Sequence, residues 1–158
     1  MGILAHSVLG KGLLTGKYKR GHAFPDDDER SGFFDFQGER FNQYCDAVEK
    51  LTAIATRKGH TMTELAVGWV LREPAVSVAL VGAKSEAQVL ANCKYVESFT
   101  EEELTEIDTI LDEAPHVNWT ITNGGYEHLP AVISFVVSQT LRCRSLKIFA
   151  PAFHNCGR

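Results

Sequence analysis

The sequence has 158 residues, with 16 Lys and Arg against 20 Asp and Glu, so the formal net charge at pH 7 is -4. A hydrophobic content of 44% and a charged content of 23% are typical of a globular protein with its own core. The acidic balance argues against nucleic-acid binding, and no apolar run approaches the roughly 20 residues that span a bilayer. Four dispersed cysteines in a sequence without a signal peptide predict reduced thiols and a cytoplasmic protein.

The charge pattern divides the sequence near residue 115. Residues 1–114 contain 12 Lys and Arg and 19 Asp and Glu, whereas residues 115–158 contain 4 and 1, so the net charge changes from -7 to +3. The second part has no clear helical period, and its β-prone run 132–137 indicates either a buried strand or an aggregation-prone segment. We therefore treat 115–158 as an unassigned tail.

The first predicted element is a buried strand, because residues 2–9 form a short apolar run that Gly10 and Gly12 end. A long glycine-rich and charged loop follows over residues 16–38. The acidic run 26–29 within this loop is interpreted as solvated, because consecutive carboxylates cannot wrap around an ion. No metal site is predicted anywhere in the chain.

Helices account for most of the remaining elements. Apolar residues recur at steps of three and four between Phe41 and Ala55, which predicts an amphipathic helix, and Gly59 ends it. The spacing S/T-x-x-E/Q, in which two side chains cap the first turn of a helix, then occurs three times. Further helices are expected to begin at these pairs: Thr61 with Glu64, Ser85 with Gln88, and Thr100 with Glu103.

A second strand is predicted at the β-branched run 76–81, which Gly82 ends. Strands that alternate with helices indicate an α/β fold with a parallel sheet and right-handed crossovers. Two parallel strands alone leave both sheet edges open and much apolar surface uncovered. Residues 1–114 are therefore expected to belong to a larger structure.

Three segments resemble the aldo-keto reductase family. Residues 6–18, HSVLGKGLLTGKY, are similar to the family's Y-S-P-L-G-x-G-x-L-T-G-K signature after barrel strand seven, with His6 and Val8 in place of Tyr and Pro. Residues 61–71 resemble T-x-x-Q/E-L-A-L-A-W-V-L, and residues 82–92, GAKSEAQVLAN, resemble the pattern G-A-K/S-S-x-x-Q-x-x-x-N after strand eight. The resemblance covers residues 2–113. It implies a fragment of a (β/α)8 TIM barrel, with strands seven and eight, their helices and an atypical C-terminal tail.

The resemblance also implies a cofactor, NADP(H), held by the loops after these two strands. Glycines permit close approach of a pyrophosphate, a lysine supplies a point charge, and the start of a helix favours a ribose 2′-phosphate. Arg30 is a further candidate from the loosely aligned loop. By resemblance, the contacts fall on Ser7, Leu9, Gly12, Lys17, Gly82, Lys84, Ser85, Gln88 and Asn92, of which the last two share a helical face and can reach one adenine edge.

The catalytic Asp, Tyr, Lys and His of this family lie on early strands that have no counterpart here, so no catalytic residue is assigned. Because a complete barrel of this class has about 250 residues, the sequence predicts a truncated reductase. NADPH-dependent reduction of a small aldehyde or ketone would then belong to the intact parent. The alternative is a noncatalytic module that binds a nucleotide or docks onto a partner, completing a barrel by association.

Overall fold

The structure, a computed structural model, describes residues 3–115. The tail prediction, including the run 132–137, lies outside this range. The described elements are a pair of strands, several helices and short 3₁₀ turns, in the order β1 (Ile3–Ala5), η1 (Gly10–Thr15), η2 (Glu29–Gly32), η3 (Phe34–Phe36), α1 (Gly38–Arg57), α2 (Met62–Leu71), β2 (Val76–Ala79), α3 (Glu86–Asn92) and α4 (Glu101–Glu113).

The strands β1 and β2 pair in parallel, as the alternation of strands and helices predicted. Ala5 lies opposite Ala79, and the register shifts between Ile3 and Leu4. The N–H of Leu80 extends the pairing by donating to the carbonyl of Ala5 at 2.7 Å. Because the strands are parallel, the segments that follow them both leave from the same edge of the sheet.

The prediction of a buried first strand is wrong in extent and in burial. The strand covers Ile3–Ala5 and not residues 2–9, and the side chains of Ile3 and Leu4 are 48% and 61% exposed. A parallel strand is buried when strands flank it and layers cover both faces. Within residues 3–115, however, β1 and β2 pair only with each other, so the apolar side chains remain in contact with solvent.

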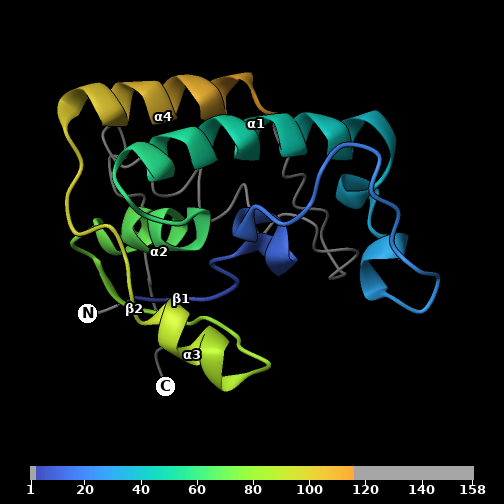
Figure 1. Cartoon of the computed structure of the whole chain (residues 1–158), viewed down its shortest axis with the longest axis horizontal. Helices are drawn as coiled ribbons and strands as arrows, with labels where there is room; N and C mark the ends of the chain where they lie inside the picture. The colour runs from blue at the N-terminus through green and yellow to red at the C-terminus, as the bar shows by residue number, and fades with distance from the viewer. Residues whose placement is uncertain (1–2, 116–158) are drawn as a thin grey trace, which may run out of the picture.

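The helices form the main core in layers. In Figure 1, α1 and α4 lie side by side, α2 lies beneath them, and the strands lie on the far side of α2. This position explains why α2 is buried nearly all round whereas α1 and α4 are amphipathic. The predicted stripe of α1 faces the core through Phe41, Tyr44, Cys45, Val48, Leu51, Ile54 and Ala55.

The middle of α2 touches a neighbouring backbone at Gly68. A Cβ on Gly68 would lie 2.2 Å from the carbonyl oxygen of Val96, and the N–H of Val96 donates to the carbonyl of Glu64 at 3.1 Å. Trp69, predicted to be a core residue, is 5% exposed and packs edge-on against Phe99. The segment between α3 and α4 is therefore held directly against α2.

Two of the three predicted capping boxes are complete, at Thr61 with Glu64 and at Thr100 with Glu103. The third prediction is half right. The Ser85 hydroxyl accepts the N–H of Gln88 at 3.3 Å, but the Gln88 side chain accepts from the N–H of Lys84 at 2.7 Å, one residue before the cap. Gln88 therefore binds the preceding loop instead of closing the box.

Candidate cofactor site

The two glycine-bearing segments singled out in the sequence follow the two strands at the same edge of the sheet. Residues 6–17 leave β1 and include η1, which packs against α1 and α2. Residues 80–85 leave β2 and lead into α3. The loops at the carboxyl ends of adjacent parallel strands are the usual ligand-binding position of such folds.

The backbone of the first segment is wound tightly. Positive φ angles occur at Gly10 (52°), Gly12 (92°) and Gly16 (73°), and also at Ser7 (58°) and Lys11 (51°). The N–H of Gly10 donates to the carbonyl of Ser7, and that of Gly12 donates to the carbonyl of Leu9 at 2.9 Å. These N–H groups are therefore already paired within the turn, and the glycines adopt positive φ angles that residues with a Cβ rarely adopt.

Gly12 is the point where several side chains meet. A Cβ on Gly12 would lie 3.6 Å from Nη1 of Arg30, 3.7 Å from the Tyr18 ring and 3.8 Å from Cε of Lys17. Nζ of Lys17 lies 4.7 Å from the centre of the Tyr18 ring. An anion beside Gly12 would therefore be within reach of a lysine and an arginine, and no side chain of Gly12 would block it.

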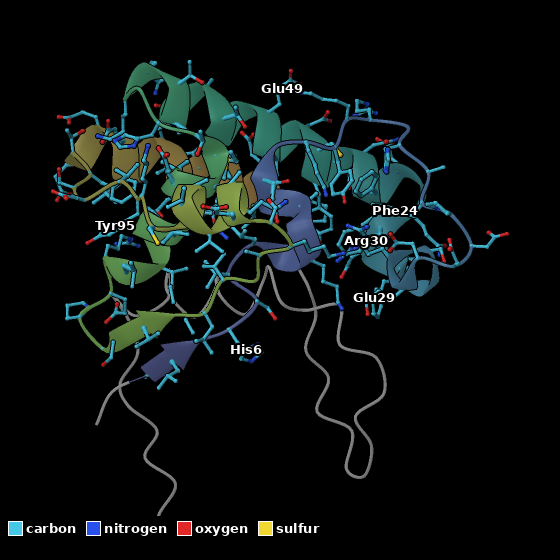
Figure 2. All side chains as sticks on the ribbon, turned by 60° about the horizontal axis from the view of Figure 1, so that its bottom comes forward. His6, Phe24, Glu29, Arg30, Glu49 and Tyr95 are labelled. Carbon is cyan, nitrogen blue, oxygen red and sulfur yellow. The ribbon has the colours of Figure 1, made fainter. Side chains whose placement is uncertain are left out.

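Arg30 is the most constrained of these cations. Its guanidinium donates to the Lys11 carbonyl at 3.2 Å and to the Tyr18 hydroxyl, and it pairs with Asp28 through two nitrogens. The group also stacks over the ring of Phe24, 4.6 Å from the ring centre. Figure 2 shows Arg30 beside Phe24 and Glu29, at the end of the molecule opposite Tyr95.

Charge accumulates around the first segment. Nζ of Lys11 lies 2.9 Å from a carboxylate oxygen of Glu29 and 4.6 Å from the centre of the Phe33 ring. The hydrogen bonds from Arg30 hold the pKa of Asp28 well below its usual range, and the positive charge of Lys84 lowers it further. Arg30 is therefore the main cause of this lowered pKa, and Lys84, which comes from the second loop, has the smallest effect.

The predicted adenine-contacting residues bind their own loop. Nδ2 of Asn92 donates to the carbonyl of Gly82 at 3.3 Å, and Oε1 of Gln88 accepts from Lys84 as described above. Gly82, Lys84, Ser85 and Gln88 are exposed, and α3 has no buried residue. The hydrogen bonds of Gln88 and Asn92 therefore fix the shape of the loop that would receive the nucleotide.

One feature of the site differs from what the sequence suggested. The acidic run was interpreted as solvated, yet Asp28 is half-buried, caps η2 and pairs with Arg30, whereas Asp26 and Asp27 are exposed. The spacing of Asp28 and Arg30, D-x-R, was the sequence signal for this pair, because an Asp at an N-cap can reach the residue two positions later. Tyr18 is buried beneath the Arg30 side chain.

His6, which replaces the family's Tyr, is exposed, and its Nδ1 lies 3.0 Å from the Ser7 hydroxyl. Within residues 3–115 we find no group of three or more His, Cys, Asp or Glu side chains that could hold a metal ion. None of the helices in that range has the length and apolar character that crossing a membrane requires.

Comparison with known proteins identifies the family. The family model described as "Aldo/keto reductase family" matches residues 1–112. The chain belongs to this family. It is 37% identical over 111 residues to Aldo-keto reductase YhdN of Bacillus subtilis, covering 69% of this chain and 34% of that protein. It is 33% identical over 122 residues to a putative voltage-gated potassium channel subunit beta of Schizosaccharomyces pombe, covering 72% and 35%.

A solved structure agrees with this assignment. The glycerol dehydrogenase AKR11B4 of Gluconobacter oxydans matches with a TM-score of 0.67 and 34% sequence identity, over 78% of this chain and 38% of that one. The predicted fold class is therefore confirmed: the two parallel strands and their helices form part of an aldo-keto reductase barrel. The chain spans about a third of the length of the relatives it matches.

Proposed function

We propose that this chain forms the NADP(H)-binding part of an aldo-keto reductase that reduces a small aldehyde or ketone. The observation that carries the proposal is the convergence of Lys17 and Arg30 on Gly12, in the loop after β1, whose parallel partner β2 leads into the loop that carries Lys84. The residues fit a dinucleotide, because two cationic side chains lie next to Gly12, which has no side chain of its own. The family uses a nicotinamide cofactor with carbonyl substrates, which agrees with this fit.

The proposed contacts divide between the two loops. Lys17 and Arg30 would neutralise the pyrophosphate, with Ser7, Leu9 and Gly12 forming the floor beneath it. Lys84 and Ser85 would bind the ribose 2′-phosphate as point charge and hydroxyl donor. Gln88 and Asn92 would hold the second loop, with Gly82, in the form that receives the adenosine. The bound cofactor supplies the hydride for the reduction.

Catalysis itself is assigned to other parts of a complete barrel. By resemblance, β1 and β2 correspond to barrel strands seven and eight, whereas the family's Asp, Tyr, Lys and His lie on earlier strands, so we propose that the chain is an incomplete reductase. Tyr18 is not assigned the role of proton donor, because it belongs to the segment after β1 and its ring is buried beneath the Arg30 side chain. Free Cys45 and Cys93 support the proposed cytoplasmic location.

Titration of the purified chain with NADPH tests the proposal. Fluorescence of the reduced nicotinamide or calorimetry would report binding, and we expect NADPH to bind more tightly than NADH because only NADPH carries the 2′-phosphate. Lys84→Met should remove most of that preference, whereas Lys94→Met, an exposed lysine beyond α3, should leave it unchanged. A folded chain that binds neither nucleotide would refute the proposal.

A second candidate function, docking onto a partner that completes the barrel, is favoured by the uncovered apolar surface. Large side chains are exposed on both strands, directly after β2 and on α3, at Ile3, Leu4, Val78, Leu80, Val89 and Leu90. Monomeric proteins rarely leave such a cluster uncovered. Light scattering after size-exclusion chromatography tests this function. A strictly monomeric chain at all concentrations, with no gain in association when the remaining barrel strands are supplied as a second polypeptide, would exclude it.

A further inference from the structure

The Asp28 carboxylate binds both the backbone N–H and the side chain of Arg30. Oδ1 of Asp28 accepts the backbone N–H of Arg30 at 3.0 Å and its Nε–H at 2.7 Å. Oδ2 accepts from Nη2 of the same side chain. The carboxylate therefore fixes the guanidinium along one whole edge, which is the strongest geometry available to an arginine.

The other edge of the guanidinium is also occupied. Nη1 donates to the Lys11 carbonyl and to the Tyr18 hydroxyl, and the plane lies over the Phe24 ring. An arginine has five N–H donors. Within the described residues, four side-chain donors have partners and one on Nη2 is left. Arg30 therefore has its position beside Gly12 fully determined while retaining one donor for a ligand.

We propose that Asp28 is a positioning residue for anion binding: it holds Arg30 against the open backbone of Gly12. The inference rests on the proposed binding of NADP(H). Without Asp28 the guanidinium would lose both bonds along that edge, and binding would have to restrain a long side chain first. The affinity for the phosphate-bearing ligand would therefore be lower.

Charge alone predicts the opposite effect, which makes the inference testable. Asp28 is negative and lies at a site for an anion, so neutralising it should strengthen binding if Asp28 acts only through its charge. If Asp28 acts by positioning, neutralising it should weaken binding. Asp27 is a matched control, because it is adjacent, exposed and carries the same charge.

The experiment measures the affinity for NADPH of the full chain and of the variants Asp28→Asn, Asp27→Asn, Arg30→Gln and Asp28→Asn/Arg30→Gln at one ionic strength. Asparagine keeps an oxygen that caps η2, so the loop should stay folded. We expect Asp28→Asn to weaken binding about tenfold and Asp27→Asn to leave it unchanged or slightly tighter. The double variant should bind no more weakly than Arg30→Gln alone, because Asp28 acts through Arg30.

Asp28→Ser provides a second route, since serine also caps the turn but cannot hold a guanidinium on two atoms; it too should bind NADPH more weakly. The inference is overturned if Asp28→Asn binds NADPH as tightly as Asp27→Asn, or if the effects of Asp28→Asn and Arg30→Gln simply add. These results would leave the proposed function standing, because Arg30→Gln would still weaken binding. Absence of NADPH binding by the unaltered chain would overturn both.

Discussion

Replacing Gly68 by alanine should destabilise the protein although alanine is the better helix former. The added methyl would lie 2.2 Å from the carbonyl oxygen of Val96, 2.9 Å from its nitrogen and 3.0 Å from its carbonyl carbon. All three are backbone atoms, so no side-chain rotation relieves the clash. Separating the two segments would also strain the hydrogen bond from Val96 to Glu64.

The magnitude follows from three terms. Overpacking of this kind costs about 1–3 kcal/mol, and loss of the hydrogen bond adds about 1 kcal/mol. The higher helix propensity of alanine returns about 1 kcal/mol. We therefore expect Gly68→Ala to lower the free energy of unfolding by about 1–3 kcal/mol, measured from the midpoint and slope of urea denaturation.

The matched control is Gly32→Ala. A Cβ on Gly32 would meet nothing within 4 Å, and its φ is not positive, so this variant should be neutral or slightly stabilising. The reasoning would be refuted if Gly68→Ala were as stable as Gly32→Ala. Such a result would mean that the segment between α3 and α4 does not pack on α2 as described.

Three further predictions concern the site and the core. Gly12→Ala should abolish measurable NADPH binding, whereas Gly21→Ala, which also has a positive φ (75° against 92°) but no neighbour within 4 Å, should retain it; equal loss in both would point to backbone strain alone. Ile54→Ala, at a side chain that is 0% exposed, should cost about 2–5 kcal/mol in urea denaturation, and a loss below about 1 kcal/mol would contradict its central place in the core. Burial and the charge of Asp35 raise the pKa of Tyr44 to about 12, so the folded protein keeps a proton that the unfolded chain loses near pH 10. This contribution to stability is fully present below pH 10 and is lost between pH 10 and about 12. It amounts to about 3 kcal/mol, and Tyr44→Phe should make the stability profile flatter in that window.

The sequence predicted those features that depend on neighbours along the chain. The stripe from Phe41 to Ala55 follows from helical periodicity, and the caps at Thr61 and Thr100 depend on a residue three positions later. The parallel pairing of the strands followed from their alternation with helices. The family resemblance of the loops also came from the sequence, because its motifs are contiguous.

Tertiary structure alone decided how these parts meet. The exposure of Ile3 and Leu4 depends on which strands and layers cover β1, and no local pattern in an apolar run records that. Arg30 donates hydrogen bonds to the Lys11 carbonyl, 19 positions earlier in the chain, and to the Tyr18 hydroxyl, 12 positions earlier. Periodicity and capping are short-range effects, whereas burial and long-range hydrogen bonds arise only after the chain has closed its loops. For that reason the sequence named candidate residues of the site, and only the structure showed that Asp28 pairs with Arg30 beside Gly12.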